Sequence, residues 1–284
     1  METSSNYTKQ FSSANPGFIS FILDQSGSMS EPYPEAGNKA NFVQKVVNRL
    51  INETINANAD GDKIKNRLFL SLFGCGENVT EIRSGMIEDY ANNPLRIETV
   101  NQKVSDGNGG LVDVSVQNPV YLEPVANGLT PLSSTLDVAR RVGEGFINKY
   151  PNCPALVYII ITDGMPRAKG VDDEVEEANA IAMAEKIKEL KSEDGNALIF
   201  VCHIGNGANK CEYPESESQC PDDQARFLFK IASEIPGPYK EAARKLELDL
   251  AEHSKAMVCN ADPTTFIKFI NFGSSGAQQD KMSN

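Results

Sequence analysis

Three separate segments of this 284-residue chain place carboxylate or hydroxyl side chains beside apolar runs. The first segment, ILDQSGSMS, leaves the apolar run GFISF through Asp24 and continues with Ser26 and Ser28. The second segment, IIITDGMP, ends another apolar run at Asp163, and the third, ANGLTPLSSTL, carries Thr130. Carboxylate and hydroxyl oxygens are the ligands that hard divalent cations prefer. These residue types therefore predict a hard-cation site, provided that the fold brings the three segments together.

The elements that must position these residues alternate between strands and helices. Unbroken apolar runs, typical of strands covered on both faces, lie at 17–23, 67–74, 155–162, 197–205 and 256–261. Helical patterns lie between and after them, at 39–57, 132–149, 173–192, 222–234, 238–253 and 263–272. This alternation predicts an α/β fold with a doubly wound, mostly parallel central sheet that is flanked by helices.

Such a sheet also predicts where the three segments meet. In an open parallel sheet, ligands bind beyond the carboxyl ends of the strands, near the point where the strand order reverses. Asp24 and Asp163 follow strands at that end, so we expect them to face one crevice. Pro131 holds Thr130 in an extended conformation just before a helix, which directs the Thr130 hydroxyl to the same crevice. The expected ion is Mg²⁺, with Mn²⁺ or Ca²⁺ as alternatives, and an incoming carboxylate would complete its shell.

The three motifs also resemble a known family in their order. Asp-x-Ser-x-Ser, then Gly-x-Thr-Pro-Leu, then Thr-Asp-Gly-x-Pro is similar to the metal-ion-dependent adhesion site (MIDAS) of von Willebrand factor type A (VWA) domains, over residues 17–272. The resemblance implies that the three hydroxyls bind the ion directly, and that the two aspartates bind it directly or through water. It also implies that an Asp or Glu of a partner protein takes the open position. The residues that match the family's ligand set are Asp24, Ser26, Ser28, Thr130 and Asp163.

A narrower resemblance concerns the subfamily. The segments GLTPL and TDGMP, in a chain without a signal peptide, look most like stand-alone bacterial VWA proteins, including those of tellurium-resistance regions. Members of that group resemble components of signalling systems that include a protein kinase and a PP2C-type phosphatase.

Each motif also has a purely structural interpretation. The segment after Asp24 could be a polar turn that leads into a helix. Thr130 could serve only as a helix N-cap, and Asp163-Gly164 is a common turn dipeptide. The joint occurrence of all three motifs in the family's order favours the metal site.

The rest of the chain suggests one domain with two insertions. We expect a VWA domain over 17–273, a flexible N-terminal segment over 1–16 and a flexible tail over 274–284. Residues 95–118 contain the alternating run LVDVSVQ after the turn signal DGNGG, which predicts an inserted β-hairpin. Residues 206–223 are polar and rich in turn formers, which predicts a surface loop. Both insertions are expected to border the metal face.

Composition excludes several classes of partner. The formal net charge of −12 argues against binding a nucleic-acid backbone, which needs clustered Lys and Arg. The chain has no apolar run near the 18 residues that would cross a bilayer and no secretory signal, so a cytoplasmic protein without membrane contact is expected.

The six cysteines are scattered, which suits reduced thiols better than a disulfide framework. A zinc site could be built from Cys202, His203, Cys211 and Cys220. However, Cys202 and His203 are neighbours on a strand and should point to opposite faces. A solvent-exposed pair of Cys211 and Cys220 is the expected alternative.

The functional hypothesis is a binding module and not an enzyme. The chain lacks a Gly-x-Ser-x-Gly elbow and a Gly-Lys-Ser/Thr phosphate loop, and neither of its two histidines is near the metal loops in sequence. The leading expectation is that the divalent cation captures an acidic residue of a partner protein. Two alternatives stay open: a regulatory component of a bacterial kinase/phosphatase system, in which phosphate could replace carboxylate at the metal, and a Mg²⁺-dependent hydrolase.

Overall fold

A seven-stranded sheet forms the centre of the molecule in the computed structural model, which describes residues 6–34, 36–105, 110–205, 208–248 and 250–275. The strand order is β14-β15-β13-β10-β1-β6-β7. The five inner strands run parallel, whereas β7 and β14 pair antiparallel at the two edges. The strands are β1 (Gly17–Asp24), β6 (Leu68–Cys75), β7 (Val79–Met86), β10 (Val157–Thr162), β13 (Leu198–Ile204), β14 (Cys211–Glu212) and β15 (Met257–Ala261). The predicted doubly wound, mostly parallel sheet is confirmed.

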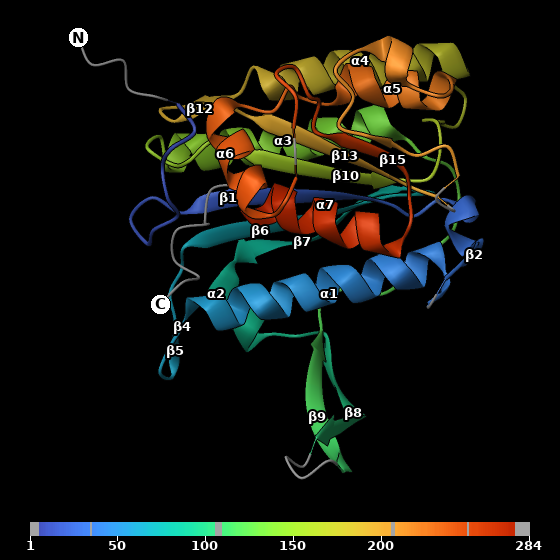
Figure 1. The fold of residues 1–284 in the computed structure, drawn as a ribbon. Helices are drawn as coiled ribbons and strands as arrows, with labels where there is room; N and C mark the ends of the chain where they lie inside the picture. Colours follow the sequence, from blue (N-terminus) through green and yellow to red (C-terminus); the bar gives the residue numbers. More distant parts are fainter. Residues whose placement is uncertain (1–5, 35, 106–109, 206–207, 249, 276–284) are drawn as a thin grey trace.

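Helices cover both faces of this sheet (Figure 1). One face packs against α3, α4 and α5, and the other packs against α1, α2, α6 and α7. The helices are α1 (Lys39–Asn58), α2 (Ile87–Asn92), α3 (Leu132–Lys149), α4 (Asp173–Lys188), α5 (Asp223–Ile231), α6 (Gly237–Lys245) and α7 (Pro263–Ser275). Alternate side chains of β1 enter the two hydrophobic clusters, Phe18 and Ile22 on the α3 side and Phe21 and Leu23 on the α1 side. This explains why β1 reads as an unbroken apolar run.

The order of the strands fixes where the carboxylates lie. β1 pairs with β6 on one side and with β10 on the other, so the sheet winds in both directions from β1. Asp24 is the last residue of β1, and Asp163 directly follows β10. The two aspartates therefore lie at the same end of adjacent parallel strands, as predicted.

Three hairpins with two-residue strands and two 3₁₀ turns also belong to the described fold. The 3₁₀ turns span Gly27–Ser30 and Glu217–Gln219. The hairpins pair β2 (Pro32–Tyr33) with β3 (Gly37–Asn38), β4 (Ala59–Asp60) with β5 (Lys63–Ile64), and β11 (Lys191–Ser192) with β12 (Gly195–Asn196).

Several boundaries differ from the prediction. The helix expected over 173–192 ends at Lys188 because the β11–β12 hairpin follows it. The helix expected over 238–253 ends at Lys245, two residues before Glu247 adopts a positive φ of 59°. The sequence reading also missed β7 and α2, because polar residues interrupt the edge strand VTEIRSGM and α2 has only six residues.

The predicted inserted hairpin is present and consists of β8 (Arg96–Ser105) and β9 (Leu111–Val120). It projects from the body beside α1 (Figure 1). At its base, Asn52 Nδ2 donates to Pro119 O over 3.4 Å. Asn52 lies about 20 Å along α1 from Lys39, at ~1.5 Å rise per residue. The hairpin therefore extends from the flank of α1, and the expectation that it borders the metal face is wrong.

The second insertion is more ordered than a surface loop. It contributes the edge strand β14, which pairs with β15 and places Cys211 opposite Cys259. Cys211 and Cys220 are both buried against the α5 side of the sheet, so the prediction of a solvent-exposed thiol pair is wrong. All six cysteines are buried free thiols.

The ends of the chain were expected to be flexible. Residues 1–5 and 276–284 lie outside the described part of the chain, and α7 continues to Ser275. Within the described N-terminal segment, the backbone N–H groups of Thr8 and Lys9 donate to Asp194 Oδ1 over 2.9 and 3.0 Å. Flexibility of these segments stays a prediction.

Two glycines of α3 provide a matched test of the packing. A Cβ added at Gly143 would lie 1.9 Å from Tyr158 Oη, whereas a Cβ at Gly145 would meet nothing within 4 Å. We expect Gly143→Ala to lower the free energy of unfolding by about 2 kcal/mol, because the helix must move off the sheet. Gly145→Ala should raise it by about 0.5–1 kcal/mol, because alanine is the better helix former. Urea unfolding of both variants checks this, and equal effects of the two substitutions would contradict the packing described.

Candidate functional site

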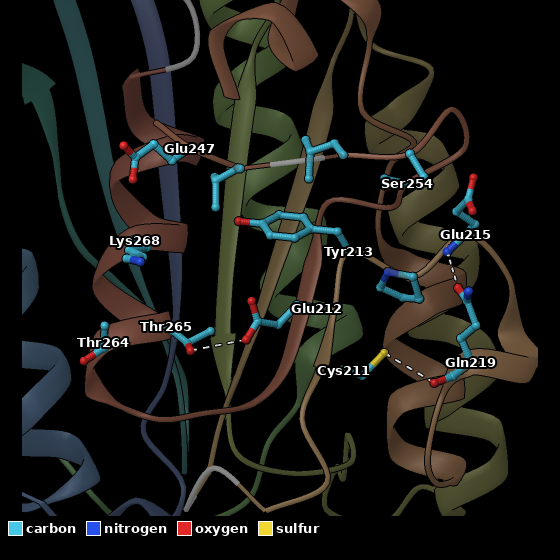
Figure 2. A pocket seen from close by; sticks show the side chains of 14 residues that line it. Cys211, Glu212, Tyr213, Glu215, Gln219, Glu247, Ser254, Thr264, Thr265 and Lys268 are labelled. Atoms are coloured by element: carbon cyan, nitrogen blue, oxygen red, sulfur yellow. Dashed lines mark hydrogen bonds between the residues drawn. The ribbon is translucent and has the colours of Figure 1, made fainter. Parts of the chain in front are cut away.

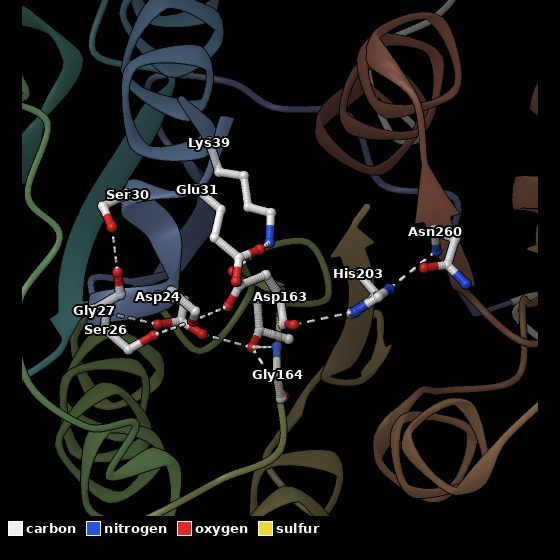
Figure 3. Close-up of polar contacts among 12 residues, drawn as sticks. Asp24, Ser26, Gly27, Ser30, Glu31, Lys39, Asp163, Gly164, His203 and Asn260 are labelled. Carbon is white, nitrogen blue, oxygen red and sulfur yellow. Dashed lines mark hydrogen bonds and ion pairs between the residues drawn. The ribbon is translucent and has the colours of Figure 1, made fainter. Parts of the chain in front are cut away.

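The predicted site lies where the loop after β1 meets the loop after β10 (Figure 3). Asp24 is 4% exposed, and each of its carboxylate oxygens accepts one hydrogen bond. The backbone N–H of Ser26 donates to Oδ1 over 2.8 Å, and the hydroxyl of Thr162 donates to Oδ2 over 2.7 Å. Asp24 thus fixes the start of its own loop and also ties β1 to the end of β10.

The two serines link this loop to Asp163. Ser28 Oγ donates to Asp163 Oδ1 over 2.7 Å, and the hydroxyl oxygens of Ser26 and Ser28 are 3.1 Å apart. A serine hydroxyl carries one proton, so when Ser28 donates to Asp163, Ser26 is the donor of any hydrogen bond between the two serines. Four of the five predicted residues therefore belong to one connected network. Ser28 is exposed, so this network is open to solvent.

Thr130 approaches the site through its backbone. Its N–H donates to Arg167 O over 3.0 Å and its C=O accepts from Arg167 N–H over 2.8 Å, so it is tied to the chain that follows Asp163. In the same segment, Gly128 O accepts from Gly27 N–H over 3.1 Å. Among the residues that the structure describes, no hydrogen bond joins the Thr130 hydroxyl to the other four predicted residues.

The structural interpretations of the three motifs explain only part of this arrangement. The bond from Ser26 N–H to Asp24 is an ordinary local turn contact. Thr130 does not cap α3, because the N-cap residue is Pro131 and no side chain caps the helix. In the first turn, Glu176 accepts from both the N–H and the hydroxyl of Ser133, over 2.9 and 2.8 Å. A turn at Asp163-Gly164 does not by itself require the side chain of Asp163 to be 0% exposed, as it is here.

Lys39 is a member of the site that sequence reasoning missed. Its Nζ lies 2.7 Å from Asp163 Oδ2 and 2.6 Å from Glu31 Oε2, and its side chain is 11% exposed. Lys39 is the first residue of α1, where the helix dipole disfavours a cation. A lysine at a helix start requires a compensating anion nearby, but the sequence does not show which residue supplies it. Burial opposes the charge of Lys39, but hydrogen bonds and charge from Asp163 and Glu31 outweigh it and raise the Lys39 pKa.

His203 supports the loop of Asp163 from the neighbouring strand. The backbone N–H of Asn260 donates to His203 Nδ1 over 3.0 Å, so Nδ1 is an acceptor and the neutral ring carries its proton on Nε2. Nε2 lies 3.3 Å from the backbone oxygen of Asp163 and donates to it. Burial lowers the pKa of His203 and favours this neutral form. Cys202 and His203 point to opposite faces of the sheet, as predicted.

The charges of the site favour a cation. Burial raises the pKa of Asp24, hydrogen bonds from Ser26 and Thr162 partly offset this, and the nearby charge of Asp163 adds to it. The ammonium group of Lys39 contacts Asp163, and the second anion near it, Glu31, is largely in solvent with 62% of its side chain exposed. A cation bound between the aspartates would relieve their mutual repulsion.

The donor chemistry of these residues fits a hard divalent cation. Asp24 and Asp163 supply carboxylate oxygens, and the buried Ser26 and the exposed Ser28 supply neutral oxygens. In the described part of the chain, no group of three or more His, Cys, Asp and Glu residues is arranged to hold a metal. A cation at this site would use hydroxyl oxygens beside the two aspartates.

A separate pocket of about 680 Å³ lies between β14 and α7 (Figure 2). Glu212, Tyr213, Thr265 and Lys268 line it, and Thr265 and Glu212 form a hydrogen bond of 3.5 Å. None of the five predicted ligands lines this pocket.

Comparison with known proteins gives similarity in three dimensions only. No family model matches the chain, and no curated protein matches it. The solved structures similar to it include the PilB minor pilin from Streptococcus sanguinis, with 11% identity over 95% of this chain and 61% of that chain and a TM-score of 0.48. They also include proximal thread matrix protein 1 from the mussel byssus with a zinc-occupied MIDAS motif, with 13% identity over 94% and 47% of the two chains and a TM-score of 0.41.

A third similar structure is the ArnB paralog VWA2 from Sulfolobus acidocaldarius, with 14% identity over 69% of this chain and 36% of that chain and a TM-score of 0.33. The present chain spans less than two thirds of each of these three chains. Separately, none of the described helices combines the length and apolar character needed to span a bilayer.

The lowered pKa of His203 gives a pH dependence with a defined sign. Because the folded pKa lies below the unfolded value of about 6.5, the contribution of the neutral ring to stability is complete above pH 6.5. It is lost as the pH falls through the unfolded pKa towards the lower folded pKa. We expect wild type to lose free energy of unfolding between pH 7.5 and 5.5 more steeply than His203→Gln, by up to about 1.4 kcal/mol per pH unit.

Urea titrations at pH 7.5, 6.5 and 5.5 measure this difference, with His253→Gln as the control because His253 is exposed. If the pH profiles of wild type and His203→Gln run parallel, His203 does not fold as a buried neutral ring.

Proposed function

We propose that this chain is a VWA-type binding module that holds a divalent cation and uses it to capture an acidic side chain of a partner protein. The observation that carries this proposal is the network of Asp24, Ser26, Ser28 and Asp163 at the ends of two adjacent parallel strands. The order of the three sequence motifs supports it independently of these contacts. The proposed module is not an enzyme.

Two kinds of ligand would hold the cation, hydroxyl oxygens and carboxylate oxygens. Ser26, Ser28 and Thr130 would supply neutral oxygens directly, and the two aspartates would bind directly or through water. Mg²⁺ is the proposed ion, with Mn²⁺ or Ca²⁺ as alternatives, and when bound it supplies positive charge for an incoming carboxylate. His203 keeps the loop of Asp163 in place through its bond to the Asp163 backbone, and the Thr162 hydroxyl accepts from the backbone N–H of Gly164 over 3.2 Å.

The charge of the chain makes this local attraction necessary. A protein with a net charge of −12 repels an acidic partner at long range, and this repulsion weakens as salt screens it. The cation must outweigh the repulsion at short range. The proposed partner is a protein with an exposed Asp or Glu, and the proposed location is the cytoplasm.

A second candidate follows from the GLTPL and TDGMP segments. Their resemblance to stand-alone bacterial proteins, including the tellurium-resistance type, favours a regulatory component of a kinase/phosphatase-linked signalling system. A phosphorylated partner would offer a group with about −1.5 to −2 charge to the same cation. Competition by a phosphopeptide but not by an acidic peptide would select this candidate.

Serine substitutions in one loop test whether the site binds a cation. Ser28 lies in the network, whereas Ser30, two residues further on, donates its hydroxyl to Gly27 O and serves as the control. We expect Ser28→Ala to weaken Mn²⁺ binding at least about tenfold, because an oxygen ligand is lost. Ser30→Ala should leave Mn²⁺ affinity unchanged. Titration of free Mn²⁺ by electron paramagnetic resonance measures both, and equal affinity in the two variants would refute the assigned ligand set.

Affinity capture from the native host tests the partner. We expect proteins retained on the immobilised chain in Mg²⁺ buffer to be released by EDTA, and not to be retained by Asp24→Ala. Asp24→Ala must first be shown to unfold cooperatively, because Asp24 also ties β1 to β10. Partners that stay bound in EDTA and on the folded Asp24→Ala variant would show that recognition does not use the cation.

A further inference from the structure

We propose that Lys39 acts as a tethered cation that holds Asp163 until a divalent cation displaces it, and that Glu31 then keeps the released ammonium group. The inference rests on the proposed metal-binding function and adds a competitor built into the chain. Lys39 would lower the affinity of the site for metal, so a higher concentration of the divalent cation would be needed to fill it.

The first support is the position of Lys39, which the fold determines. The β2–β3 hairpin pairs Pro32 with Asn38, and it returns the chain so that Lys39 N–H donates to Glu31 O over 3.1 Å. Asn38 caps α1 by accepting from Asn41 N–H over 2.8 Å. The backbones of Lys39 and Glu31 are therefore held together by contacts that do not involve their side chains.

The second support is that all three oxygen atoms of Asp163 already have a partner. Ser28 donates to Oδ1, His203 donates to the backbone oxygen, and Lys39 occupies Oδ2 at 2.7 Å. Among these three donors only Lys39 carries charge, since Ser28 and His203 are neutral. A divalent cation that binds Asp163 must therefore meet the ammonium group of Lys39.

The divalent cation and the ammonium group of Lys39 compete for Asp163 because both are positively charged. The Asp163 side chain is 0% exposed, so charges around it are weakly screened by solvent. A divalent cation and an ammonium group that both contact the same buried carboxylate lie close together and repel each other strongly. In addition, when both aspartates are ionised they carry two negative charges, which a divalent cation balances without Lys39.

Glu31 can keep the ammonium group of Lys39 paired after it leaves Asp163. It already contacts Lys39 Nζ at 2.6 Å, and its side chain is 62% exposed, so it can turn outward with Lys39. The four-carbon stem of lysine is flexible enough for this movement. Glu31 therefore lowers the free-energy cost of releasing Asp163.

Four variants and one titration test the inference. Lys39→Met removes the competing charge, and Lys45→Met is the control because Lys45 is an exposed lysine on the same helix. Free Mn²⁺ is measured by electron paramagnetic resonance. We expect Lys39→Met to bind Mn²⁺ about tenfold more tightly than wild type, because the Asp163 carboxylate no longer has to be released from Lys39 before the cation binds. Lys45→Met should match wild type.

Two further variants keep the test valid if Lys39→Met folds poorly. Lys39→Arg keeps the charge and should bind Mn²⁺ no more tightly than wild type. Glu31→Gln removes the receiving carboxylate and should weaken Mn²⁺ binding. Amine acetylation read by mass spectrometry gives a readout other than affinity, and Mg²⁺ should increase the modification of Lys39 while leaving that of Lys45 unchanged.

The outcomes separate this inference from the proposed function. If wild type and folded Lys39→Met bind Mn²⁺ with equal affinity, Lys39 does not compete and the inference is wrong while the metal site stands. If Lys39→Met binds more weakly, Lys39 assists binding and the inference is also wrong. If neither chain binds Mn²⁺, both the inference and the proposed function fail. Binding by Lys39→Met alone would support the inference in its strongest form.

Discussion

The burial of two carboxylates at the ends of adjacent parallel strands is the constraint on which the rest of the site depends. Asp24 ends β1 and Asp163 follows β10, in a place where solvent screens their repulsion little. The chain stabilises them with neutral donors from Thr162, Ser26 and Ser28 and with a single ammonium group. A single ammonium group does not balance two carboxylates, and the proposed divalent cation would.

The topology explains why this constraint can be met. Because the sheet winds in both directions from β1, the loops that leave β1 and β10 start side by side at the same end of adjacent parallel strands. Neighbouring strands hold the loops from behind. His203 on β13 binds the backbone of Asp163, and Asn260 on β15 fixes the tautomer of His203. Four adjacent strands thus contribute to the position of one carboxylate.

The sequence predicted those features that depend on local pattern. Five apolar runs identified the parallel strands, and the loop motifs identified Asp24, Ser26, Ser28 and Asp163 as neighbours. It could not predict the contact of Lys39 with Asp163, because that contact depends on how the β2–β3 hairpin returns the chain to the start of α1. The burial of Cys211 was missed for a similar reason. The polar segment around Cys211 pairs as an edge strand with β15, and pairing between distant segments leaves no local pattern.

The central claim is that a divalent cation binds between the loop after β1 and the loop after β10. A crystal of the full chain soaked in Mn²⁺, with anomalous diffraction data, tests it most directly. We expect one anomalous peak in contact with the hydroxyl oxygens of Ser26 and Ser28, and in contact with Asp24 and Asp163 either directly or through one water molecule. An empty site in a crystal that shows Mn²⁺ elsewhere, or no bound Mn²⁺ at saturating concentration, would contradict it.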